Sequence, residues 1–165
     1  MCAEDHRTRL TETSVIEQIV SSLENFKWDC AVYCEAVGAL RFICLDCEKC
    51  VACNSVLDAD QLTFSLTAHA EARVSGGICL DLVIQGMKRF AKVPIVQERS
   101  TNLFLLLSSF DRNLGRLLKR GVLGRLLSAM KQHMKAPQIQ EHALGIILNM
   151  ALRRRLVNGY KTLDI

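Results

Sequence analysis

The sequence predicts an all-α protein built as a solenoid, in which short helical repeats stack on one another. Apolar residues recur at helical spacing through most of the 165 residues. The chain has only two prolines, Pro94 and Pro137, which lie 43 positions apart, and each is followed three residues later by a Gln-Glu pair. A period of ~43 residues is typical of solenoids, whose units bury their apolar faces against their neighbours.

Three predicted helices share one design of the buried face. Their inward-facing residues, nearly all apolar, fall at offsets 0, 4, 7, 8 and 11, which lie on one side of an α-helix. The three sets are Val96, Ser100, Leu103, Phe104 and Leu107; Ile139, Ala143, Ile146, Ile147 and Met150; and Val32, Ala36, Ala39, Leu40 and Ile43. A second amphipathic segment precedes each set, at 14–26, 77–88 and 121–131.

The repeat boundaries follow from glycines and from a change in spacing. Gly77 and Gly121 open two of the second helices, where a sharp bend favours a residue without Cβ. The first buried face precedes the second by 64 positions rather than 43, which indicates an insertion near 46–68. We therefore predict one domain, 1–165, with about three repeats (5–45, 71–108 and 112–151) and an incomplete fourth at 153–165.

The segment RNLGRLLKRGVLGRLLSAMKQHMKAPQIQEHALGIILNMA, residues 112–151, resembles one whole armadillo repeat. Gly121 matches the glycine between the first two helices of such a repeat, and Asn149 matches the asparagine of its third helix. The resemblance implies a right-handed superhelix, with a concave groove lined by the third helices that holds an extended peptide or a partner helix.

The resemblance also implies which side chains line that groove. Import receptors of the armadillo family use arrays of Trp and Asn there, and this chain matches one of the six positions compared. The expected groove residues are Glu35, Gly38, Phe42, Arg99, Asn102, Leu106, His142 and Asn149. Phe42 and Leu106 would meet apolar side chains of a partner, or would pack as extra core between repeats. Asn102 and Asn149 would hold the partner's backbone amides.

Four cysteines at a spacing of three form the main alternative site: Cys44, Cys47, Cys50 and Cys53. This spacing resembles the first three ligands of a ferredoxin loop, and it opens the alternative of a metal- or redox-sensing protein. A zinc site lacks the usual spacer between cysteine pairs, and a continuous helix would turn Cys44 and Cys53 to opposite sides. Incidental thiols, buried as small apolar side chains, are the favoured interpretation, so we expect no cofactor.

The net charge of +4 is unevenly distributed, since residues 1–60 carry −6 and residues 61–165 carry +10. The candidate basic surface comprises Arg112, Arg116, Lys119, Arg120, Arg125, Arg153, Arg154 and Arg155. It could dock an acidic protein, nucleic acid or a membrane surface, or be an ordinary solvated face. Nucleic acid is disfavoured as a partner because no stacking aromatic residues are interleaved with these charges.

The sequence favours a binding protein over an enzyme, because it contains no phosphate-binding loop, nucleophile elbow or metalloprotease helix. The expected partner is a protein or peptide. We expect no signal peptide and no membrane span, and the reduced-thiol interpretation places the protein in the cytosol or the nucleus. The segment 153–165 resembles the start of a further repeat, which predicts either a fragment or isoform of a longer protein, or self-association through an uncovered end.

Overall fold

The computed structural model describes residues 15–44, 77–109 and 111–161, and within these ranges the chain consists of helices joined by short turns, with no strand. An all-α protein is therefore confirmed. The helices are α2 (Val15–Asn25), α3 (Cys30–Cys44), α6 (Gly77–Arg89), α7 (Pro94–Ser108), α8 (Asp111–Lys119), α9 (Val122–Gln132) and α10 (Pro137–Lys161). The predicted insertion at 46–68 lies outside the described residues.

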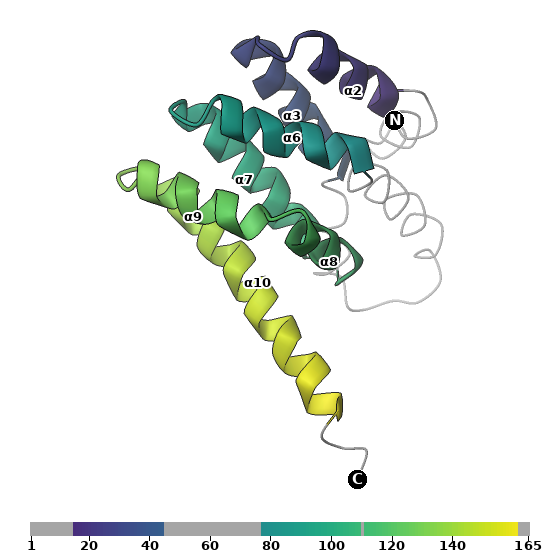
Figure 1. The fold of residues 1–165 in the computed structure, drawn as a ribbon, viewed down its shortest axis with the longest axis vertical. Coiled ribbons are helices and arrows are strands. Elements are labelled where there is room, and N and C mark those ends of the chain that lie inside the picture. The colour runs from purple at the N-terminus through teal and green to yellow at the C-terminus, as the bar shows by residue number, and fades with distance from the viewer. Residues whose placement is uncertain (1–14, 45–76, 110, 162–165) are drawn as a thin grey trace, which may run out of the picture.

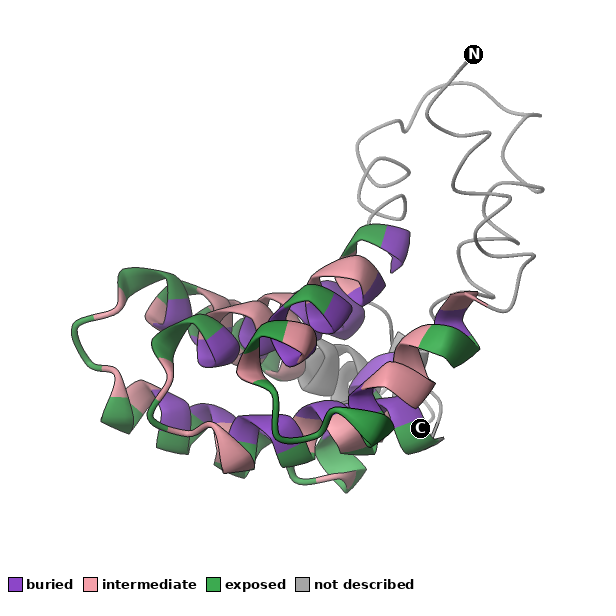
Figure 2. Ribbon diagram, turned by 90° about the horizontal axis from the view of Figure 1, so that it is seen from above, coloured by how far each residue is buried: buried purple, intermediate pink, exposed green. Residues whose placement is uncertain are grey.

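Three helical hairpins, α2–α3, α6–α7 and α9–α10, stack in chain order (Figure 1). The second helices of the hairpins form one row, α3, α7 and α10, in which α7 packs between the other two. The first helices form the other row, and the buried residues face the space between the rows (Figure 2). Pro94 and Pro137 begin α7 and α10, where their fixed φ suits the first turn and their missing N–H needs no partner.

The predicted buried faces largely coincide with the observed core. All five predicted residues of α7 are buried, as are Ile139, Ala143 and Ile146 of α10. In α3 the buried face is wider than predicted, because Tyr33 and Val37 are also buried whereas Val32 and Ala39 are half-buried.

The 43-residue period recurs in the hydrogen bonds of two loops. Gln97 donates from Nε2 to the carbonyls of Met87 and Phe90, both at 3.0 Å. Gln140 donates in the same way to the carbonyls of Met130 and His133, at 2.9 and 3.1 Å. Each donor and each acceptor is displaced by the same 43 positions, so the glutamine of the repeated Gln-Glu pair bridges the loop of its own hairpin.

The first hairpin closes its loop differently. Asp29 caps α3 by accepting hydrogen bonds at Oδ1 from the backbone N–H groups of Ala31 and Val32, at 2.8 and 3.0 Å. Tyr33 occupies the position equivalent to Gln97, 64 residues earlier, but its hydroxyl lies 2.9 Å from the carbonyl oxygen of Val83, in the next hairpin. Its ring fills the space beside Gly86, where a Cβ would overlap the ring. At this position the first hairpin is therefore bonded to the second hairpin instead of to its own loop.

Gly121 makes the bend between α8 and α9, as the sequence predicts. Its φ is +70°, the left-handed region in which a Cβ is unfavourable. In the second repeat the piece expected before Gly77 lies outside the described residues.

The end of the chain corrects one prediction. We expected one repeat to end at residue 151 and a new one to begin at 153, but α10 continues unbroken from Pro137 to Lys161. Residues 151–158 contain neither Pro nor Gly, and their Leu and Arg residues favour helix. In consequence α10 is ten residues longer than the 15-residue helices α3 and α7. None of the described helices is both long enough and apolar enough to cross a bilayer.

Candidate interaction face

The predicted groove residues lie on α3, α7 and α10, and we call the surface of these three helices the third-helix face. Polar contacts connect α3 to α7 across it. The Arg99 guanidinium lies 3.5 Å from a carboxylate oxygen of Glu35, and Arg41 donates from Nε to Oδ1 of Asn102 at 2.8 Å. The structure thus brings Glu35 together with Arg99, and it places Asn102 against Arg41.

Gly38 provides the space that Arg99 occupies. A Cβ at Gly38 would lie 2.6 Å from a terminal nitrogen of Arg99, closer than side chains allow. The same nitrogen lies 3.4 Å from the carbonyl oxygen of Cys34. The guanidinium therefore lies across α3, with 37% of the Arg99 side chain exposed.

A second set of contacts joins α7 to α10. The Thr101 hydroxyl lies 3.3 Å from Nδ1 of His142, and Asn149 donates from Nδ2 to the Ser108 hydroxyl at 2.8 Å. Burial lowers the pKa of His142, although the carboxylates of Glu141 and Glu98 act in the opposite direction. His142 and Asn149 are half-buried, so they position α10 as well as lining the face.

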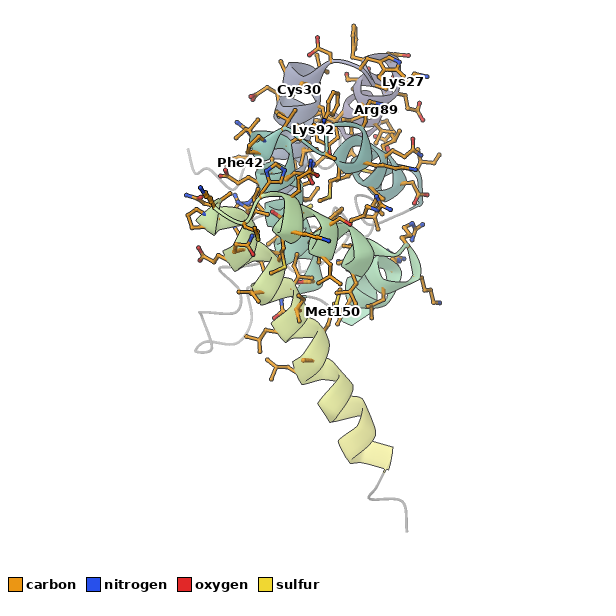
Figure 3. The ribbon with its side chains drawn as sticks, turned by 60° about the vertical axis from the view of Figure 1, so that its left-hand side comes forward. Lys27, Cys30, Phe42, Arg89, Lys92 and Met150 are labelled. Atoms are coloured by element: carbon orange, nitrogen blue, oxygen red, sulfur yellow. The ribbon has the colours of Figure 1, made fainter. Side chains whose placement is uncertain are left out.

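Leu106 corrects the predicted groove. It is 1% exposed and packs in the core between helices, which is the alternative that the sequence left open. Phe42, at the equivalent position of α3, is 49% exposed and lies at the margin of the stacked helices (Figure 3). Of the two apolar contacts expected for a partner, only Phe42 is on the surface.

Sequence reasoning missed Arg41 and Thr101, which make two of the contacts between third helices. Arg41 is equivalent to Leu105, and Leu105 lies where a Cβ on Gly145 would meet it at 2.8 Å. Both residues therefore use the same position to contact the following helix. The equivalence of positions 41 and 105 could have indicated this role from the sequence. It was hard to see because the position holds a charged residue, Arg41, in one repeat and an apolar residue, Leu105, in the next.

The candidate basic surface is only partly available to a partner. Arg120 donates from Nε to Asp81 at 2.9 Å, which joins the α8–α9 bend to α6. Lys119 is exposed, whereas Arg116 and Arg125 are half-buried. The side chains of Arg112 and of Arg153, Arg154 and Arg155 lie outside the described residues.

A further arginine also joins two hairpins, at the opposite end of α6. Arg89 lies beside Lys27 (Figure 3) and donates to its carbonyl at 2.6 Å. The Arg89 guanidinium also lies over the ring of Trp28, 4.4 Å from its centre. In the next repeat His133, one position past the equivalent of Arg89, makes a similar contact, with Nε2 2.7 Å from the carbonyl oxygen of Ala91. Basic side chains near α6 and α9 therefore hold neighbouring hairpins together.

The cysteine cluster is described only at its first member. Cys44 is buried at the last residue of α3, while Cys47, Cys50 and Cys53 lie outside the described residues. Within the described ranges, no three or more His, Cys, Asp or Glu side chains are placed to hold a metal ion. Elsewhere in the core, burial raises the pKa of Cys79 to about 12 and that of Cys34 to about 11, so both thiols are poor nucleophiles at neutral pH.

Comparison of the chain with models of known protein families, with curated proteins and with solved structures finds no match.

Proposed function

We propose that this chain is an armadillo-like solenoid of the cytosol or nucleus, without enzymatic activity, whose third-helix face binds an extended segment of a partner protein. The stacked hairpins, the repeated glutamine bridges and the left-handed Gly121 support the solenoid. An extended segment suits such a face because successive third helices offer polar groups at regular intervals to its backbone and side chains.

The observation that carries the proposal is the loose ion pair between Arg99 and Glu35. Its atoms are 3.5 Å apart and the Glu35 side chain is 78% exposed, so the pair contributes at most about 1 kcal/mol. Gly38 leaves room for the Arg99 guanidinium, which also donates to the Cys34 carbonyl at 3.4 Å. A partner carboxylate can therefore displace Glu35 at little cost and meet a guanidinium that is already positioned.

Phe42 supplies the apolar part of the same site. It lies seven residues, two helical turns, after Glu35 on α3, so both residues lie on one side of that helix. Half of its large side chain is exposed, and aromatic residues often dominate binding energy at interfaces. We expect bound segments to pair an acidic residue with an apolar residue at a fixed separation.

The test is selection from a phage-displayed library of random peptides, followed by affinity measurement with the selected peptides. We expect enrichment of sequences with one acidic and one apolar residue at constant spacing. Arg99→Glu and Phe42→Ala should each weaken binding by about tenfold or more, the cost of a lost central contact.

Matched variants on the other row separate the face from general effects. Lys88→Glu reverses a charge on exposed α6, and Phe26→Ala removes an exposed aromatic beyond α2. Both should leave affinity within about twofold of the wild type. Selection without a shared pattern, or equal losses in the matched variants, would refute the proposed site.

A further inference from the structure

The loops that close the three hairpins lie side by side along one edge of the stack (Figures 1 and 2). They comprise residues 26–29, 90–93 and 133–136, and we call them the loop edge. Each loop is joined to the next. Arg89, directly before the second loop, donates to the carbonyl of Lys27, and Nε2 of His133 lies 2.7 Å from the carbonyl oxygen of Ala91. The three loops therefore form one continuous surface.

Positive charge is concentrated at the loop edge. Each loop has one exposed lysine, and a further exposed lysine lies in the last turn of α6 and of α9; the five are Lys27, Lys88, Lys92, Lys131 and Lys135. None of them forms an ion pair with a carboxylate that the structure describes. The carboxylates nearby in the chain are Glu24 and Asp29, both in the first hairpin, and Asp29 caps α3. The second and third loops therefore contain no negative charge to offset their lysines.

Large apolar side chains are exposed at the same edge. Met134 and Trp28 are 77% and 72% exposed, which makes them the two most exposed large apolar side chains among the described residues. Trp28 is nevertheless positioned, because the Arg89 guanidinium lies over its ring. In the first and third loops, an exposed apolar side chain thus lies next to an exposed lysine in the chain.

This combination of groups matches the surface of an anionic lipid bilayer. Lysines are attracted to the negative surface potential of such a membrane. Tryptophan favours the layer of lipid headgroups, because its ring is apolar and its indole N–H is polar. A partner that presents single carboxylates or bases is usually bound by the planar fork of arginine. The arginine beside these lysines, Arg89, is already engaged with Lys27 and Trp28.

We propose that the loop edge docks on the anionic surface of a lipid bilayer. Trp28 and Met134 enter the headgroup layer, and the lysines lie among the phosphates and carboxylates of the lipids. A bilayer surface is broad and continuous, so it can meet all three loops at once. The inference is independent of the proposed peptide site, because it uses no residue of the third-helix face.

Tryptophan fluorescence tests the proposal directly, because Trp28 is the only tryptophan of the chain. With vesicles of two parts phosphatidylcholine and one part phosphatidylserine, the emission should shift to shorter wavelength and become protected from quenching by acrylamide. Vesicles of phosphatidylcholine alone should cause no shift, and added salt should weaken the effect because it screens exposed charges. A response to soluble poly-glutamate without a response to the mixed vesicles would indicate an acidic protein as the partner and overturn the proposal.

Cosedimentation with the mixed vesicles measures the contribution of each group. Lys92→Gln and Lys135→Gln should each weaken binding by roughly fivefold, the effect of removing one lysine from an anionic membrane surface. Trp28→Ala should weaken it by about tenfold, as expected for partial burial of a large apolar side chain.

Matched controls lie on α8, which adjoins the opposite end of α9 from the loop edge. Lys119 is exposed and Leu118 is 47% exposed, so Lys119→Gln and Leu118→Ala should leave binding within about twofold of the wild type. Far-UV circular dichroism verifies that each variant is folded. A wild type that does not bind the mixed vesicles, or equal losses in the control and loop-edge variants, would overturn the proposal.

Discussion

Replacing Gln97 by Met tests whether the loop-bridging glutamines hold the repeats together. Gln97 is 2% exposed, and its amide donates to two carbonyls, of Met87 and Phe90, at the end of the preceding helix. Methionine has a similar volume and flexibility, so the change removes both hydrogen bonds without opening a large cavity.

The expected loss follows from the environment of the two carbonyls. A hydrogen bond contributes ~1 kcal/mol net, but a buried acceptor left without its donor costs about 1–3 kcal/mol. The Met87 bond is buried and the Phe90 bond is partly buried, so Gln97→Met should destabilise the protein by ~2–4 kcal/mol. The equivalent Gln140 is half-buried, and Gln140→Met should cost about 1–2 kcal/mol because water can reach its carbonyls.

Urea unfolding monitored by far-UV circular dichroism measures both free energies. We expect a lower midpoint with an unchanged m-value for each variant, and a larger loss for Gln97→Met than for Gln140→Met. Gln85→Met on the exposed side of α6 is the control for the substitution itself. If Gln97→Met lay within ~0.5 kcal/mol of the wild type, the bridges would be geometric coincidences rather than sources of stability.

Three further predictions concern single positions. Gly121→Ala should destabilise by ~1 kcal/mol because of its φ of +70°, whereas Gly124→Ala within α9 should stabilise by ~0.5–1 kcal/mol; thermal unfolding compares them, and changes of the same sign would refute the argument. Because burial lowers the pKa of His142, its contribution to stability is full above about pH 6.5 and is lost as the pH falls. An NMR titration, with His142→Gln to assign the signal, should give a pKa below the ordinary value of histidine. A pKa at or above that value would show that burial does not disfavour the charged ring. For Cys79 the raised pKa has the opposite consequence: the advantage of the wild type over Cys79→Ala should be full below about pH 9 and shrink by up to ~1.4 kcal/mol per pH unit towards pH 11, and a constant difference in unfolding free energy would refute it.

The features that the sequence predicted well depend on local periodicity. The helix positions, the buried residues of α7, the bend at Gly121 and the correspondence of Gln97 with Gln140 all follow from spacing along one segment. Such patterns need no knowledge of the neighbouring helices.

The features that the sequence missed depend on contacts between segments. Leu106 and Phe42 occupy equivalent positions, yet one is buried and the other is half exposed because their neighbours differ. Arg41 joins α3 to α7 because the fold places Asn102 beside it, and the sequence of α3 alone does not reveal that neighbour. The helical course of α10 past residue 151 was missed because the repeat pattern, taken literally, required a break there.

The hydrogen bonds of Tyr33 make the first hairpin depend on the second. Gln97 and Gln140 each return their hydrogen bonds to their own hairpin, whereas the Tyr33 hydroxyl contacts Val83 and Ser100 of the second hairpin, the latter at 2.7 Å. Part of the hydrogen bonding that orders the first hairpin therefore comes from its neighbour. The second and third hairpins make the equivalent hydrogen bonds within themselves. Order should therefore spread along the chain from α6–α7 towards the N-terminus, and a fragment ending at Cys44 should not hold the α2–α3 hairpin together by itself.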